Sequence, residues 1–361
     1  MPIPDRILMG PGPCNPYPEA TLALGRPMLG HLDPEFLAIL DEACDRLRTV
    51  FATDNVRTLP VSGTGSAGME AAFVNTVSAG DTVVVAVNGL FGERMVDVAG
   101  RCGATVERVD AEWGTAVDPD AVLAAARRTG AKLIAAVHAE TSTGVANDIA
   151  ALGAGKGDAL LLADCVTSLG GIPVDVGGWG VDVAYSGTQK CLGVAPGLAP
   201  FTIGEAAWAR RVAKPQSWYL DLGMIGEYTA GAARKYHHTA PVAMIVSLHA
   251  GLGAVLDEGL DAAIARHAAC GAALQDGLES MGLELFADKS CRLPELTAVK
   301  VPDGVDSAAV RRTLLERYGI EIGGGVGAYA ASVWRIGCMG HTARLRNVVL
   351  VLAALADILG R

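Results

Sequence analysis

The chain has 361 residues, of which 51% are hydrophobic and 19% are charged, so it can bury a large core and form two domains. Its net charge of -10 argues against a nucleic-acid partner, because phosphate binding requires clustered Lys and Arg. No apolar run is long enough to cross a bilayer, so we expect no membrane partner.

The amino terminus lacks the basic segment and apolar stretch of a secretion signal, which favours a cytoplasmic location. The eight cysteines are scattered, without a Cys-x-x-Cys pair. This spacing indicates buried free thiols, and suggests neither a disulfide framework nor a zinc site.

A glycine- and serine-rich turn at residues 62–68 comes first among the chemically informative elements, directly before a helical stretch at 69–74. Small residues let a backbone approach an anion, and a helix start offers free N–H groups and a positive dipole end. We therefore assign Thr64, Gly65 and Ser66 as phosphate ligands. Taken alone, such a turn is also typical of an ordinary helix cap.

Apolar strands alternate with alanine-rich amphipathic helices, a pattern typical of an α/β fold with a mostly parallel sheet covered on both faces. We expect central strands at 82–87, 132–137, 159–163 and 181–185. Polar or aromatic residues follow each of them, at 88–92, 138–144, 164–166 and 186–190. Because ligands bind at the carboxyl ends of such strands, these four segments predict one shared cavity.

Asp164 ends the third of these strands, and Lys190 follows the fourth. A lysine amine can form a Schiff base with an aldehyde, and a carboxylate can keep a pyridinium nitrogen protonated. These are the two contacts that pyridoxal phosphate needs from a protein, so the pair predicts this cofactor. Singly, the lysine would be a surface charge and the aspartate a turn or helix cap.

Arg335 is a single charge within the apolar run 332–336. An unpaired buried charge is costly, so a bound anion explains this residue better than a solvated surface does; pairing with a structural carboxylate is the alternative. His237 and His238 suggest a metal pair, but adjacent residues do not face the same way and no third ligand is evident. We expect no metal site.

The order of the motifs resembles that of the class V aminotransferases, and most closely the alanine–glyoxylate and serine–glyoxylate (serine–pyruvate) enzymes. The segments that carry this resemblance extend over nearly the whole chain, at 10–13, 62–65, 88–89, 140–144, 164, 168–171, 185–190, 236–239 and 335–337. The resemblance implies a fold type I architecture, a homodimer with each site at the subunit boundary, and three parts. These are an amino-terminal arm (1–18), a large cofactor domain (19–258) and a small α+β domain (259–361).

In the small domain we expect strands at 295–301 and 332–336 and helices at 308–318 and 343–359. The glycine-rich loop at 323–327 either shapes substrate access or is a tight turn.

Carried onto this chain, the resemblance gives Lys190 the cofactor's Schiff base and Asp164 its pyridinium nitrogen. The resemblance also implies that Phe91, where the family often has Trp, stacks on one face of the cofactor ring and that Val166 contacts the other face. Thr141 is implied to lie near O3′ and the substrate. The implied phosphate ligands are Gln189 and, from the neighbouring subunit, Tyr236 and Thr239. Arg335 is implied to bind the substrate carboxylate, for which a guanidinium has the matching planar fork.

The implied reaction is transfer of the amino group of alanine or serine to glyoxylate or pyruvate, in ping-pong order. Among the matched motifs only Arg335 is placed to bind a carboxylate, which favours amino-acid donors with small neutral side chains. Arg26, Arg234 or Lys235 could nevertheless bind a second carboxylate. The alternatives are a ureidoglycine–glyoxylate aminotransferase, a cysteine desulfurase that uses Cys291 or Cys338, and a catalytically silent scaffold. Desulfurases resemble one another in having His before the lysine, where this chain has Gln189.

Overall fold

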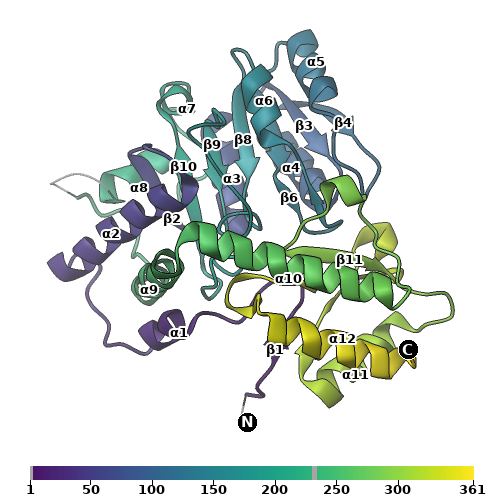
Figure 1. The fold of residues 1–361 in the computed structure, drawn as a ribbon. Coiled ribbons are helices and arrows are strands. Elements are labelled where there is room, and N and C mark those ends of the chain that lie inside the picture. Colours follow the sequence, from purple (N-terminus) through teal and green to yellow (C-terminus); the bar gives the residue numbers. More distant parts are fainter. Residues whose placement is uncertain (1–2, 230–233) are drawn as a thin grey trace.

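The central sheet of the molecule is α/β in character and mostly parallel (Figure 1). The structure, a computed structural model, describes residues 3–229 and 234–361. Within these residues the sheet has seven strands, in the spatial order β2 (Arg57–Ser62), β10 (Leu198–Ile203), β9 (Val183–Tyr185), β8 (Leu160–Asp164), β5 (Leu133–Val137), β3 (Thr82–Val87) and β4 (Thr105–Asp110). Only β10 runs antiparallel to its neighbours.

Helices cover both faces of this sheet. On one face lie α3 (Gly65–Thr76) and α4 (Leu90–Arg101), and on the other lie α5 (Pro119–Thr129) and α6 (Ile149–Gly155) (Figure 1). The chain steps outward from β3 through α4 to β4 and then back inward through α5 to β5. Since both crossovers are right-handed, the two helices must lie on opposite faces. Strands enclosed in this way are apolar along their whole length, and β5 and β8 are buried throughout.

The other helices described in the first 258 residues are α1 (Pro18–Leu24), α2 (Pro34–Phe51), α7 (Glu205–Ala209), α8 (Leu222–Thr229) and α9 (Val242–Glu258). Of these, α2 contacts β2 and β10, and α9 packs against α1 and α2. Helix α2 begins sharply because the Asp33 side chain accepts a hydrogen bond from Glu35 N and Pro34 occupies the first helical position.

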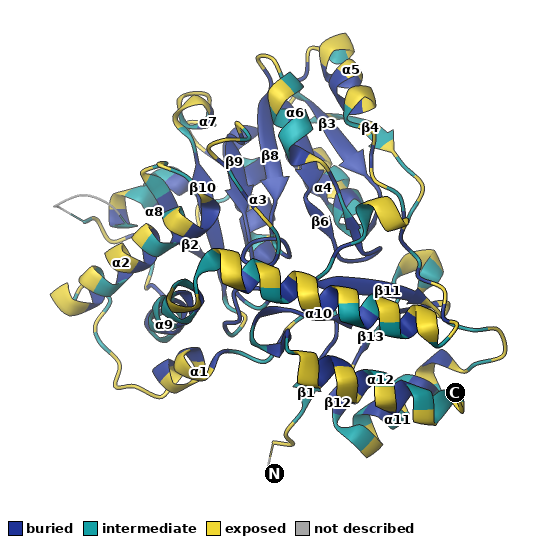
Figure 2. Cartoon of the chain, viewed as in Figure 1, coloured by how far each residue is buried: buried dark blue, intermediate teal, exposed yellow. Residues whose placement is uncertain are grey.

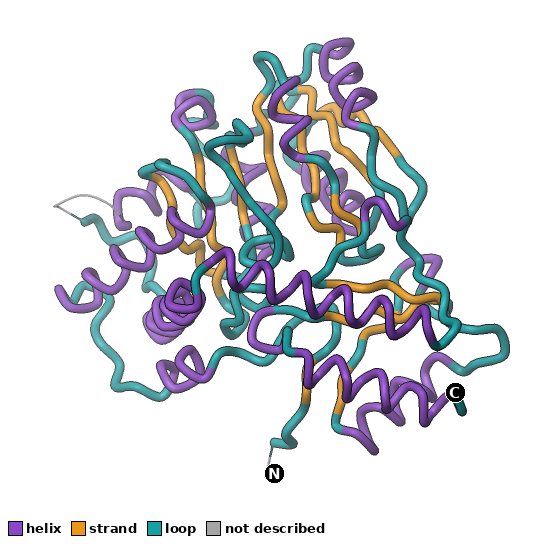
Figure 3. The backbone as a smooth tube through the Cα atoms, viewed as in Figure 1, coloured by secondary structure: helices purple, strands orange, loops and turns teal. Residues whose placement is uncertain are grey.

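The carboxyl-terminal part is a smaller α+β unit (Figure 3). Its antiparallel sheet has the order β11 (Leu296–Lys300), β14 (Val333–Gly337) and β13 (Gly323–Gly324), and it packs with α10 (Leu260–Ser280), α11 (Ser307–Tyr318) and α12 (Leu345–Leu359). Two further pairs are β1 (Ile7–Leu8) with β12 (Ile320–Glu321), and β6 (Ala139–Glu140) with β7 (Val145–Ala146). Through β1, the amino-terminal segment therefore joins the far end of the chain.

The buried residues form two main hydrophobic clusters, one around the large sheet and one between β11, β14 and helices α10 to α12 (Figure 2). Met9 belongs to the second cluster. The division at residues 18 and 258 stays a prediction. Among the described residues no single helix is long and apolar enough to cross a membrane; α9 and α10 together have the length and composition, but they meet at a bend of 83°.

All four predicted central strands are present, with ends that differ by at most two residues from the prediction. Three helices begin elsewhere than expected, of which α11 starts one residue early, at Ser307. Helix α3 starts at Gly65, inside the glycine-rich turn, and α12 starts at Leu345 because a short 3-10 turn at Gly340–Thr342 precedes it.

Candidate active site

A cavity of about 160 Å³ lies at the carboxyl edge of the parallel sheet. It is lined by Thr64, Gly65, Ser66, Met69, Phe91, Arg94, Asp164, Val166, Gln189 and Lys190. The register explains the convergence, because Asp164 is paired with Val137 on one side and Tyr185 on the other, so three strands end at the same level. The loops that leave these ends carry the site.

Lys190 lies in the loop after β9 and is almost fully buried. Its amine donates a hydrogen bond to Pro11 O, in the amino-terminal segment. Burial, and then repulsion from Arg335, lowers the pKa of Lys190 to about 8. Gly12 has φ +102°, and a Cβ there would lie 2.5 Å from Lys190 Nζ, so only glycine leaves room for the amine.

Asp164 is buried at the end of β8, with both oxygens engaged. Oδ1 accepts a hydrogen bond from Val166 N at 2.8 Å and Oδ2 accepts one from the Tyr185 hydroxyl at 2.7 Å. Burial raises the pKa of Asp164 to about 6, and these hydrogen bonds, with the charges of Lys190 and Arg94, oppose the rise. A desolvated carboxylate held in this way is a strong acceptor for a cationic N–H.

The glycine-rich turn forms an open helix start. Thr64 is the N-cap of α3, but its side chain makes no capping bond, and the N–H groups of Gly65 and Ser66 have no acceptor among the described residues. A Cβ on Gly65 would come 2.7 Å from Val166 Cγ2, so glycine lets the helix start lie against that side chain. Gln189 Oε1 is buried and accepts no hydrogen bond from the described residues. The free N–H groups of Gly65 and Ser66 are the donors that suit an anion.

Thr141 and Arg335 lie beside this cavity. Thr141 lines a small adjoining cavity together with Phe91, Asp164 and Val166. Arg335, on β14, donates from Nε to Gly324 O at 2.7 Å and from Nη1 to Thr141 O at 3.3 Å. It makes no ion pair with any carboxylate of the described residues, so the alternative of a structural carboxylate partner is not supported. Burial lowers the pKa of Arg335.

Tyr236 and Thr239 lie on the surface, outside the residues that line the cavity, and Tyr236 is 58% exposed. The two neighbouring histidines bond elsewhere: His238 Nε2 lies 2.8 Å from Ser62 Oγ, and His237 Nε2 lies 3.3 Å from Tyr219 O. Their rings are perpendicular and contact separate partners.

Comparison with known proteins agrees with this geometry. The family described as Aminotransferase class-V matches residues 14–345. The chain belongs to the class V aminotransferases. It is 38% identical to the (S)-ureidoglycine–glyoxylate transaminase of Bacillus subtilis, over 99% of this chain and 91% of that protein, and 38% identical to the alanine–glyoxylate aminotransferase of Drosophila melanogaster, over 98% and 92%. The crystal structure of the alanine–glyoxylate aminotransferase from Nostoc sp. superposes with a TM-score of 0.97 at 44% identity, covering 99% of this chain and 96% of that one.

The cofactor of this aminotransferase is pyridoxal 5′-phosphate. The cavity fits it, because a reactive amine (Lys190), a desolvated carboxylate (Asp164) and an open helix start (residues 64–66) are the three groups that its aldehyde, ring nitrogen and phosphate require. Eight of the residues predicted from the sequence line this one cavity, and Thr141 lines the next.

Three residues of the aminotransferase site were missed. Met69 and Arg94 line the cavity, and Glu140 is buried below it. The Glu140 carboxylate accepts hydrogen bonds from Phe91 N, Gly92 N and both N and Oγ of Ser142. It thereby fixes the start of α4. Helical spacing could have found Arg94, since it lies three residues after Phe91 on the same helix face.

Neither thiol proposed for a desulfurase lies in this site. Cys338 is fully buried beneath β14, and Cys291 is half-buried near Gly114 O. Burial raises the pKa of both thiols. A nucleophilic cysteine needs a lowered pKa and access to the substrate, so the structure does not support the desulfurase alternative.

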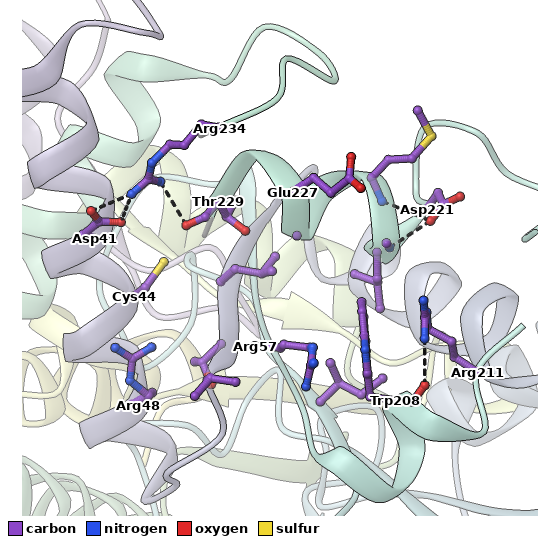
Figure 4. A pocket seen from close by; sticks show the side chains of 18 of the residues that line it. Asp41, Cys44, Arg48, Arg57, Trp208, Arg211, Asp221, Glu227, Thr229 and Arg234 are labelled. Atoms are coloured by element: carbon purple, nitrogen blue, oxygen red, sulfur yellow. Dashed lines mark hydrogen bonds and ion pairs between the residues drawn. The ribbon is translucent and has the colours of Figure 1, made fainter. Parts of the chain in front are cut away.

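A second cavity of the aminotransferase, of about 930 Å³, shares no residue with the cofactor cavity. Figure 4 shows it between α2, β2 and α8, where Arg234 forms two hydrogen bonds with Asp41, at 2.5 and 2.6 Å. Lys235 pairs with Glu227. Arg26, Arg234 and Lys235 therefore do not line the cofactor cavity of their own chain, and they provide no second carboxylate clamp in it.

Proposed function

We propose that this aminotransferase moves the amino group of alanine or serine to glyoxylate or pyruvate, in ping-pong order. The observation that carries the proposal is Arg335, a half-buried guanidinium fixed by Thr141 O and Gly324 O. These hydrogen bonds use two of its five N–H groups, so parallel N–H groups of the guanidinium are left to bind one carboxylate. A single clamp suits a donor with a small neutral side chain.

Each residue has a defined task in the proposed reaction. Pyridoxal phosphate supplies an aldehyde for the substrate amine and an electron-withdrawing ring. Lys190 would hold the cofactor by its aldehyde and, as a free amine, would be the base for the proton on the substrate Cα. Its lowered pKa keeps a usable fraction unprotonated near neutral pH. Asp164 holds the proton on the ring nitrogen, and Arg335 orients the substrate carboxylate.

A homodimer in the cytoplasm is part of the proposal. Tyr236 and Thr239 are exposed and lie outside their own cavity, which supports a role in a neighbouring subunit's site. All eight cysteines are free, which is typical of proteins in reducing compartments.

The test is the absorbance spectrum of the purified protein after separate additions of L-alanine, L-serine and L-aspartate, without a keto acid. Loss of the yellow band with alanine or serine, and its return with glyoxylate, is the expected result. Bleaching by aspartate alone would overturn the proposed donor class. Lys190→Ala should abolish bleaching by every donor.

The relative from B. subtilis favours one alternative, a ureidoglycine–glyoxylate transaminase. (S)-ureidoglycine added in the same assay distinguishes the two. If only this compound bleaches the protein, the alternative replaces the proposal.

A further inference from the structure

The phosphate of the cofactor raises a question of charge in this site. The ligands expected for it are the hydroxyls and backbone N–H groups of residues 64–66, the amide of Gln189, and the hydroxyls of Tyr236 and Thr239. All of them are neutral. A phosphate near neutral pH carries almost two negative charges, and an anion in a partly enclosed cavity is costly without a cationic partner.

Two of the ten residues that line the cavity are cations, Lys190 and Arg94. Lys190 is assigned to the cofactor aldehyde, and its amine donates a hydrogen bond to Pro11 O. Arg335 is held at Thr141 O and Gly324 O and is absent from this lining. Arg94 is therefore the cation that remains for the phosphate.

Arg94 is positioned over the open helix start. It extends from α4, one turn after Phe91, and its guanidinium lies 4.9 Å from the centre of the Phe91 ring. Nη1 donates to Ser66 Oγ at 3.2 Å, at the start of α3. Arg94 forms no ion pair with any carboxylate of the described residues, so none of these carboxylates neutralises its charge. Two helices thus bring a free cation to the predicted phosphate ligands.

The location also relates Arg94 to the rest of the cofactor. Arg94 and Asp164, the carboxylate for the ring nitrogen, line the same cavity, and the charge of Arg94 is one of the groups that oppose the rise in the pKa of Asp164 caused by burial. Phe91, which supports the guanidinium, is the residue expected to stack on the ring. A guanidinium resting on an aromatic face keeps its N–H edge free for hydrogen bonds, and a phosphate accepts two of them in parallel.

We propose that Arg94 is the cationic ligand of the cofactor phosphate and that it completes the neutral set formed by Thr64, Gly65, Ser66 and Gln189. In this role Arg94 anchors pyridoxal phosphate but takes no part in proton transfer. The proposal concerns cofactor binding, so it does not depend on which amino acid is the donor.

The test compares pyridoxal 5′-phosphate with pyridoxal, which lacks the phosphate, in titrations of cofactor-free protein followed by the yellow absorbance band. Arg94→Met keeps most of the side-chain length and removes the charge. We expect its dissociation constant for pyridoxal phosphate to rise about 10-fold to 100-fold, while its affinity for pyridoxal stays within about twofold of the original protein. Added salt should weaken pyridoxal phosphate binding more in the original protein than in the variant.

Arg101→Met is the matched control, because Arg101 is an exposed arginine of the same helix that pairs only with Asp97. It should bind both compounds normally. Unchanged binding of pyridoxal phosphate by Arg94→Met would overturn the proposal, and so would an equal loss for both compounds, which indicates a structural role. If Arg94→Met does not fold, Arg94→Gln removes the charge and keeps a polar side chain, and a loss confined to pyridoxal phosphate is again the expected result.

Discussion

Lys190 illustrates how burial sets the chemistry of a single residue. An exposed lysine amine is protonated near neutral pH and does not attack an aldehyde. In Lys190, desolvation by burial and the charge of Arg335 together lower the pKa of the amine. The charge of Asp164 and the hydrogen bond to Pro11 O do not cancel this decrease. The same residue type on the surface of β11, Lys300, is paired with Glu284 and half-exposed.

The pH dependence of cofactor attachment follows from this shift. Below its pKa Lys190 is charged and inert, and above it the free amine attacks, so the rate of attachment rises with pH. We expect half of the plateau rate near pH 8, instead of near 10.5, the ordinary pKa of a lysine amine. Stopped-flow absorbance of cofactor-free protein mixed with pyridoxal phosphate measures it. A midpoint close to 10.5 would contradict the expectation, and Lys300→Ala, the control, should leave the profile unchanged.

At the scale of elements, Glu140 connects two segments that are distant in the sequence. Its carboxylate holds the amino-terminal N–H groups of α4 at 3.1 Å (Phe91) and 3.3 Å (Gly92), and the Ser142 hydroxyl at 2.6 Å. Burial raises the pKa of Glu140, and these hydrogen bonds oppose that rise. The loop after β5 thus fixes the helix that carries Phe91 and Arg94.

Glu140→Ala should remove this support. We expect the free energy of unfolding to fall by about 2–4 kcal/mol, because four buried donors lose their acceptor, and cofactor affinity to fall with it. Urea unfolding and cofactor titration measure the two effects. Glu70→Ala, an exposed position on α3, is the control and should change stability by less than about 0.5 kcal/mol. Equal stability of the two variants would refute the role of Glu140.

Glu295, directly before β11, is a fully buried carboxyl whose two oxygens have no partner among the described residues. Burial raises its pKa from 4.5 to about 8. Between these values the unfolded chain has lost the proton and the folded chain retains it, so stability falls as pH rises from about 5 to 8. Glu295→Gln is neutral at every pH and should remove this contribution to the pH dependence of stability. The free energy of unfolding of the variant, relative to that of the original protein, should therefore be roughly 2–5 kcal/mol higher at pH 8 than at pH 5. Urea unfolding of both proteins at pH 5 and pH 8 measures this difference. If the free energy of unfolding changes by the same amount between the two pH values in both proteins, the prediction is wrong.

At the scale of the whole molecule, exposed aromatic side chains lie at and beside Tyr236. The His31 and Tyr236 rings lie 5.3 Å apart, the Trp218 ring lies 4.4 Å from that of His237, and Tyr236 and Trp218 are 58% and 59% exposed. Large exposed side chains of this kind are typical of an interface. They support the proposal that a second copy covers this surface.

Mixing two inactive variants tests the shared site. One is Lys190→Ala, and the other combines Tyr236→Ala with Thr239→Ala. In a mixed dimer one of the two sites has every original residue, so co-expression at limiting cofactor should restore about a quarter of the original activity. Lys190→Ala mixed with Asp164→Ala is the control: these changes affect the same chain's cavity, so a shared dimer has no intact site. Equal recovery in the two mixtures would contradict a shared site.

The sequence by itself determined the central strands and most of the cofactor cavity. Strands buried on both faces must be continuously apolar, and polar residues that interrupt such runs at their carboxyl ends mark a ligand, so Asp164, Lys190 and residues 64–66 could be found from local patterns. The start of α12 was misplaced, because helix ends depend on the packing of a preceding turn.

Only the tertiary structure decided how these residues interact. The lowered pKa of Lys190, the approach of Arg335 to Thr141, the support of α4 by Glu140 and the free charge of Arg94 all depend on distances between segments far apart in the chain. Sequence patterns report which face of an element is buried. They do not report which charge lies opposite which, because desolvation and Coulomb forces act through space and depend on the packed arrangement of the elements.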